Sequence, residues 1–246
     1  MENKVIKVRN LVKKFGSFVA NDNLNFDVYK GEIFGFLGAN GAGKTTTIRI
    51  LSGLSAPTSG SVEVSGFDAA KQSEGIKKNI GYMSQKFSLY EDLTVRENIT
   101  LYGGIYGMNR KMIRERKAEL LEKLHFHEYE NMIIAALPLG LRQKLAFSVA
   151  LLHSPKIVFL DEPTGGVDPV TRRQFWEMIY ETASEGITVF VTTHYMDEAE
   201  YCDRVSILSE GKIVALDTPD NLKMKYNANS VEEVFISIAR PAKTNN

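Results

Sequence analysis

Short apolar runs separated by polar turns predict a chain that alternates between strands and helices. Strands are expected at residues 4–8, 24–28, 32–37, 61–64, 80–83, 157–160, 188–192 and 205–208. The run at 157–160, IVFL, has no polar position, which is typical of a parallel strand covered on both faces. Helices are expected between the strands, as in residues 141–152 and 171–182, where apolar residues recur three or four positions apart. The pattern predicts an α/β fold.

Residues 94–124 differ from the rest, because they contain two helical patterns in succession and no strand signal. Gly103, Gly104 and Gly107 interrupt the first pattern. We therefore expect one domain, with a core at about residues 1–85 and 153–225 and an inserted helical subdomain at about residues 86–152. From about residue 226 we expect a short segment packed on the core, ending in a disordered tail at 240–246.

Composition and charge narrow the class of protein. The 246 residues, 43% hydrophobic and 24% charged, suffice for a packed core. Because 30 Lys and Arg balance 30 Asp and Glu, nothing in the charge favours a nucleic-acid partner. Cys202 is the only cysteine, which excludes an intramolecular disulfide. No secretion signal and no membrane-spanning run is expected, so if the protein works at a membrane, another chain must carry the spanning helices.

The strongest chemical motif is G-x-x-x-x-G-K-T, which follows an apolar strand and precedes a helix. In such a loop, backbone N–H groups and the helix N-terminus surround phosphate oxygens. We expect Lys44 to contact the β- and γ-phosphates and the Thr45 hydroxyl to bind Mg²⁺. The alternative is a glycine-rich turn without a ligand. The candidate nucleotide-binding residues are Gly38, Asn40, Gly41, Ala42, Gly43, Lys44, Thr45 and Thr46.

A second motif, KIVFLDEPT, ends an apolar strand in two carboxylates. Asp161 is expected at the carboxyl end of the strand, where open α/β sheets bind their ligands, and is a candidate Mg²⁺ ligand. Glu162 follows it and is a candidate general base for an attacking water. The alternative is a solvated acidic turn before Pro163.

Together these motifs, in this order, closely resemble the ATP-binding-cassette (ABC) ATPases over about residues 4–238. The resemblance implies a P-loop fold whose mixed α/β core carries an antiparallel β region and a helical subdomain. It also implies ATP and Mg²⁺ as cofactors and gives four more residues a role. These are Phe15, which would stack on adenine, Gln85, which would touch Mg²⁺, Asp168, which would contact an opposing cassette, and His194, which would contact the γ-phosphate. The remaining histidines, His125, His127 and His153, are expected at the surface.

The chain departs from the family at the signature motif, usually L-S-G-G-Q, where it has Leu137-Pro-Leu-Gly-Leu141. Gly140 is retained, but Pro138 replaces the serine, so a hydroxyl donor to the nucleotide of the opposing cassette is lost. Proline is tolerated in the first turn of a helix because that position needs no N–H partner. The interpretation that this is a weakly hydrolysing half-site stays open.

Within the family, the stretch at 194–223 and the tail SVEEVFISI are most similar to ATPases of bacterial exporters with ABC-2-type permeases. The resemblance implies ATP hydrolysis for export, a second cassette as partner, and a cytoplasmic location on the inner membrane face through the permease. The alternatives are a non-transport ABC ATPase acting on ribosomes or DNA and a P-loop kinase or GTPase. The permease is expected to dock on the aromatic-rich stretch at 85–106, unless those residues form the inner face of the helical subdomain.

Overall fold

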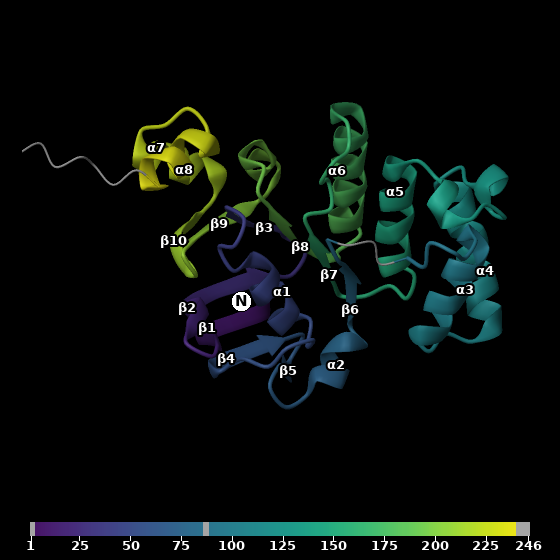
Figure 1. The fold of residues 1–246 in the computed structure, drawn as a ribbon, viewed down its shortest axis with the longest axis horizontal. Coiled ribbons are helices and arrows are strands. Elements are labelled where there is room, and N and C mark those ends of the chain that lie inside the picture. Colours follow the sequence, from purple (N-terminus) through teal and green to yellow (C-terminus); the bar gives the residue numbers. More distant parts are fainter. Residues whose placement is uncertain (1–2, 86–88, 240–246) are drawn as a thin grey trace, which may run out of the picture.

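A computed structural model describes residues 3–85 and 89–239, which form a six-stranded sheet, a four-stranded sheet and the helices around them (Figure 1). The predicted disordered tail at 240–246 and Phe87, one of the residues expected to contact a permease, lie outside the described residues. The fold confirms the expected mixed α/β core with an antiparallel β region and a helical subdomain.

The larger sheet has the strand order β10-β9-β3-β8-β7-β6, in which all pairs are parallel except β9 with β10. Its strands are β3 (Ile33–Gly38), β6 (Ile80–Met83), β7 (Ile157–Asp161), β8 (Thr188–Thr193), β9 (Arg204–Ser209) and β10 (Lys212–Asp217). Every residue of β3, β7 and β8 is buried, as the lack of polar alternation in these segments predicts. The carboxyl ends of these three neighbouring strands therefore meet at one edge.

The smaller sheet is antiparallel, with the order β2-β1-β4-β5. Its strands are β1 (Lys4–Phe15), β2 (Phe18–Tyr29), β4 (Ser59–Val64) and β5 (Phe67–Asp68). Helix α1 (Lys44–Leu51) and residues of both sheets share one apolar core, in which the rings of Phe26 and Phe34 stack with centroids 5.7 Å apart. The phosphate-loop strand β3 is thereby packed directly against the smaller sheet.

Three helices make up most of the inserted subdomain: α3 (Val95–Ile105), α4 (Arg110–Lys123) and α5 (Leu139–Ala150). Thr94 and Glu97 form a capping box that starts α3, and the Asn109 side chain caps α4. Besides α1, the α-helices outside the subdomain are α2 (Ser73–Lys77), α6 (Pro169–Ser184), α7 (Pro219–Tyr226) and α8 (Val231–Ala239). Among the described residues, none of these helices has the length and apolar character needed to cross a bilayer.

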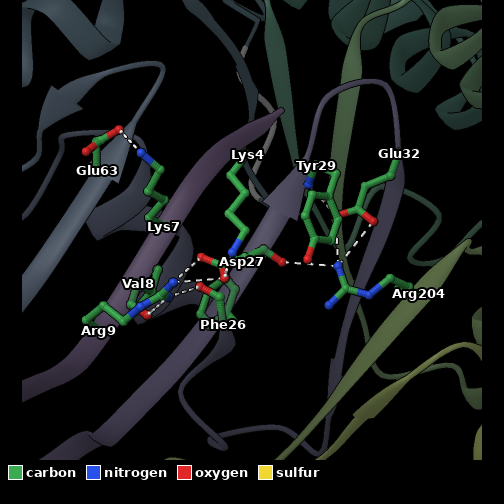
Figure 2. A network of polar contacts seen from close by, with 10 residues as sticks. All are labelled: Lys4, Lys7, Val8, Arg9, Phe26, Asp27, Tyr29, Glu32, Glu63 and Arg204. Atoms are coloured by element: carbon green, nitrogen blue, oxygen red, sulfur yellow. Dashed lines mark hydrogen bonds and ion pairs between the residues drawn. The ribbon is translucent and has the colours of Figure 1, made fainter. Parts of the chain in front are cut away.

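Arg204 links the two sheets (Figure 2). From β9 its guanidinium donates to the Asp27 carbonyl of β2 at 3.2 Å and to the Glu32 carboxylate at 3.3 Å, and it stacks 4.9 Å from the Tyr29 ring centre. Burial raises the pKa of the Glu32 carboxyl, although its hydrogen bonds with Tyr29 and Arg204 offset part of that rise. The guanidinium thus joins the smaller sheet to the sheet that carries the site.

One of the three expected surface histidines is only partly exposed. His125 and His127 are exposed, as expected, but the His153 ring stacks on Tyr106 with centroids 3.9 Å apart. Its Nε2 lies 3.0 Å from the Ile80 carbonyl, and burial lowers the pKa of its imidazole. His153 is therefore less exposed than expected, because the ring of Tyr106, at the end of α3, covers its imidazole.

Candidate functional site

The phosphate loop leaves β3 at Gly38 and enters α1 at Lys44. Gly41 and Gly43 have φ angles of 82° and 105°, a region in which side chains with a Cβ are strained. Lys44 is only 4% exposed, and its Nζ donates to the carbonyl oxygens of Gly38 at 2.8 Å and Ala39 at 3.2 Å. The ammonium group therefore lies inside the loop, where it would contact phosphate oxygens.

Glu162 lies at the centre of the predicted catalytic residues. Its carboxylate is 3.2 Å from Lys44 Nζ and 3.0 Å from His194 Nδ1. The side-chain amide of Gln85 donates to the same carboxylate at 2.9 Å. These residues follow β3, β6, β7 and β8, so the sheet brings together positions that are far apart in the sequence. The carboxylate, 8% exposed, is held on three sides by groups expected to act on the nucleotide.

The backbone of Glu162 adopts a left-handed conformation, with φ at 51°. Such a conformation costs on the order of 1–2 kcal/mol in a residue with a side chain. Its N–H donates to both the carbonyl and the hydroxyl oxygen of Thr192 at 3.1 Å, and these contacts hold the turn. The sequence analysis did not name Thr192 as a site residue. Its hydroxyl lies near the carboxyl end of β8, opposite Asp161, and this position could have indicated a role in the site.

Asp161 ends β7 and is 1% exposed. Its Oδ1 accepts hydrogen bonds from the Thr192 hydroxyl at 2.6 Å and the Thr45 hydroxyl at 3.3 Å. Burial raises the pKa of its carboxyl, and these two hydrogen bonds offset part of the rise. A carboxylate beside a hydroxyl is a pair of hard oxygen donors, which fits Mg²⁺ bound by few protein groups together with phosphates.

Comparisons with known proteins identify the family. Residues 21–165 match the family model described as ABC transporter. The chain is 46% identical over 240 residues to the probable multidrug ABC transporter ATP-binding protein YbhF of Escherichia coli (strain K12), covering 95% of this chain and 41% of YbhF. It is 34% identical over 234 residues to the linearmycin resistance ATP-binding protein LnrL of Bacillus subtilis (strain 168), covering 95% of this chain and 75% of LnrL.

The chain belongs to the ABC transporter family. A solved ATP-binding cassette, dimeric and bound to ADP and Pi in a post-hydrolysis state, matches it with a TM-score of 0.78 and 28% identity, covering 87% of this chain and 98% of that one. ABC cassettes bind ATP or ADP, and the phosphate loop described above is part of such a cassette. The chain spans less than half of YbhF, at 41% of its length.

The altered signature segment of this ABC cassette starts α5. Pro138 occupies the position before the helix, and no side chain caps the helix there. Gly140 is packed so closely that a Cβ would lie 2.6 Å from Thr171 Cγ2. Leu139 and Leu141 both line a cleft together with Gly166, and Leu141 also packs against the core. The leucines that replace the first glycine and the glutamine of the usual motif therefore both border this cleft.

Asp168 is engaged within its own chain. Its carboxylate accepts from the backbone N–H groups of Val170 and Thr171 at 3.0 Å and from the Thr171 hydroxyl at 2.6 Å, so it caps α6. The hydrogen bond from the Thr171 hydroxyl, together with the backbone hydrogen bonds, lowers the pKa of this carboxyl. Its expected contact with an opposing cassette stays a prediction.

Phe15 and Phe18 form the last pair of the β1–β2 hairpin, and both are exposed, at 56% and 62%. Phe18 lines a cavity of about 370 Å³ with phosphate-loop residues including Gly43 and Thr45. Phe15 does not line that cavity, and Lys13 Nζ lies 5.1 Å from its ring centre. Sequence reasoning missed Phe18, although an exposed aromatic so close to Phe15 was a signal for it. The hairpin tip thus offers two exposed rings, of which Phe18 borders the phosphate loop.

We expect Phe15→Ala to weaken ATP binding by about 1–2 kcal/mol, the usual worth of a base stacked on an aromatic ring. Phe15→Trp keeps a ring face and should bind ATP like the unaltered chain. Titration calorimetry with ATP measures both, and Phe18→Ala serves as the matched variant. If Phe18→Ala weakens ATP binding more than Phe15→Ala does, Phe18 and not Phe15 contacts adenine.

Proposed function

We propose that this ABC cassette hydrolyses ATP to power export through a separate ABC-2-type membrane permease. The observation that carries the proposal is the Glu162 carboxylate, which Lys44, Gln85 and His194 all approach within 3.2 Å. Export is supported by the relatives, since LnrL is named for linearmycin resistance and YbhF for probable multidrug transport. The alternative, an ATPase acting on ribosomes or DNA, has no such support.

In this proposal the phosphate loop and the N-terminus of α1 hold the phosphates, and Lys44 neutralises their charge. Glu162 accepts the proton of the attacking water, while His194 holds that carboxylate and reaches the γ-phosphate. Thr45, Asp161 and the amide oxygen of Gln85 would hold Mg²⁺. When bound, the ion neutralises charge on the phosphates.

We propose that the cassette works as a pair and that its signature segment makes a weak contact with the partner's ATP. Pro138 lacks the hydroxyl that a serine would donate, and a hydrogen bond to a charged group contributes about 1.5–3 kcal/mol. The ATP-dependent pairing is therefore expected to be roughly 10- to 150-fold weaker than with serine, since each 1.4 kcal/mol corresponds to tenfold. The purified chain is expected to be mainly monomeric.

Pro138→Ser should raise ATP-dependent dimerisation of the Glu162→Gln chain, measured by light scattering against ATP concentration. Because serine also caps helices, the gain must depend on ATP rather than on α5 stability alone. Pro138→Ala removes the ring without adding a hydroxyl and is the matched control. A tight ATP-bound dimer of the Glu162→Gln chain that serine does not strengthen would contradict the weak-contact proposal.

The proposed permease-docking surface is a line of rings across the helical subdomain. The rings of Tyr90 and Tyr102 have centroids 6.3 Å apart, those of Tyr102 and Tyr106 6.2 Å, and Tyr106 stacks on His153. Tyr90 is 51% exposed at one end of this line. Leu89, which was expected to face the permease, is only 5% exposed and belongs to the core. For Leu89 the alternative therefore holds: it belongs to the inner face of the subdomain and not to the docking surface.

Tyr90→Asp should release the chain from membranes that contain the permease while leaving its ATPase activity in solution intact. A charge on an exposed ring position disrupts an apolar contact and leaves the core unchanged. The measurement is flotation of vesicles after co-expression with the permease, which also tests the inner-membrane location. Leu54→Asp, at a position 48% exposed, is the matched control. Equal flotation of both variants would place the docking surface elsewhere.

A further inference from the structure

Glu198 is a fully buried carboxylate close to the proposed catalytic residues. It lies in the short helix Met196–Tyr201 after β8, and its side chain is 0% exposed. The hydroxyl of Thr164 donates to its Oε1 at 2.5 Å, and Nε of Arg172, from α6, lies 3.7 Å from the same oxygen. Its Oε2 has no hydrogen-bond partner among the described residues. Burying a charge is costly, so packing alone does not explain a carboxylate here.

The contacts of Glu198 join two loops that enter the site from neighbouring strands. Thr164 follows Glu162 after β7, and Glu198 follows His194 after β8. The guanidinium of Arg172 also lies 4.1 Å from the Tyr195 ring centre, and that ring is 4.2 Å from the His194 ring. One carboxylate and one guanidinium therefore fix the loop that carries His194 against the loop that carries Glu162.

A second contact holds the Glu162 loop from the opposite direction. The buried side chain of Gln143, from α5, donates to the Gly165 carbonyl at 3.1 Å, next to Thr164. The residues after Glu162 are thus anchored on both sides, by Glu198 and by Gln143. Of these two anchors, only Glu198 shares its loop with His194.

We propose that Glu198 is a positioning residue for ATP hydrolysis, which holds His194 in register with Glu162 through Thr164 and Arg172. The inference rests on the proposed roles of Glu162 and His194. It predicts that loss of the Thr164 hydrogen bond lowers kcat with little change in KM, because the phosphate loop itself is not touched. It also predicts that the environment of the His194 ring changes.

The test uses the purified full chain with Glu198→Gln, Thr164→Val, both together, and Thr164→Ser. We expect kcat for MgATP to fall about 10-fold or more in the single variants, since a misplacement of about 1 Å can cost on the order of 100-fold. KM should stay within about twofold, because binding contacts outside the reacting centre are unchanged. The double variant should lose no more than the worse single one, since residues in one contact are not additive.

Thr164→Ser keeps the hydroxyl and should retain most of the activity. Asp197→Asn, which alters an exposed carboxylate paired with the same Arg172, is the matched control and should be unaffected. The ring resonances of His194, assigned with His194→Gln, should shift in Glu198→Gln and Thr164→Val but not in Asp197→Asn. This readout needs no hydrolysis, so it tests the positioning role even if turnover is too slow to measure.

Three outcomes would overturn the positioning role. The His194 resonances could stay unchanged, or the losses in kcat of the two single variants could add up in the double variant. The third outcome is a loss in kcat that merely follows a lower unfolding midpoint. Failure of the proposed function has a different signature, because Glu162→Gln would then retain full turnover whatever Glu198 does. If Glu198→Gln does not fold, Thr164→Val still decides, since it keeps the size and shape of the side chain and removes only the hydroxyl.

Discussion

Glu162→Gln is expected to lower ATP turnover by at least ~100-fold, the lower end of the range for loss of a general base. Glutamine keeps the size of the side chain and can still accept from Gln85, but it cannot take a proton from water. Binding of MgATP should persist, because the phosphate loop and the Thr45–Asp161 pair are unchanged. Steady-state release of phosphate, together with ATP affinity from calorimetry, measures the two effects separately.

The same variant should accumulate as an ATP-bound dimer, since ATP that is not hydrolysed keeps the cassettes paired. Glu181→Gln is the matched control, because that carboxylate is 59% exposed on α6 and should change turnover by less than about twofold. Full turnover in Glu162→Gln would assign the base to another residue.

Gly43→Ala is expected to destabilise the fold and abolish ATP binding together. At φ 105° a Cβ on Gly43 would lie 2.4 Å from the Ala20 carbonyl oxygen and 2.7 Å from the Asn21 side-chain nitrogen. The left-handed backbone costs alanine on the order of 1–2 kcal/mol. The collision adds about 1–3 kcal/mol, since β2 and the loop must move apart. Urea unfolding should show a loss of about 3 kcal/mol from these two costs combined.

Gly31→Ala separates the cost of the left-handed backbone from the cost of the steric collision. Its φ is 79°, but no atom lies within 4 Å of the added Cβ, so only the backbone cost of about 1–2 kcal/mol should appear. ATP binding should persist in this control, because Gly31 lies in the turn before β3 and outside the phosphate loop. Equal losses of stability in the two variants would show that the loop yields to the methyl group.

The strands that carry the site could be predicted because their apolar runs are continuous. Residues 80–83 and 157–160 appear as predicted in β6 and β7, and the β7 run extends through Asp161. In contrast, β10 was missed, although residues 213–216, IVAL, form an apolar run like those of the predicted strands; it pairs with β9 as the antiparallel strand at the end of the sheet. The two-residue strand β5 is too short to give a pattern.

The residues of the candidate site could be predicted from the sequence, but the contacts between them could not. Asp161 and His194 lie at the carboxyl ends of two strands, and in a parallel sheet such ends meet at the same edge. The left-handed turn at Glu162 and its Thr192 contacts depend on pairing between strands, which no local pattern encodes. The burial of Leu89 and the partial burial of His153 were not predictable for a similar reason, because both depend on packing within the helical subdomain.

The position of β3 in the larger sheet determines when the nucleotide-binding site can fold during translation. β3 carries the phosphate loop, yet it lies between β8 and β9, with Ile33 opposite Val189 and Phe34 opposite Arg204. Both neighbours are made long after β3 itself, and pairing across such a sequence separation is slow. A partly synthesised chain therefore has the nucleotide-binding loop without its sheet partners and without His194. Such a chain should be unable to consume ATP until β8, His194 and β9 have emerged from the ribosome.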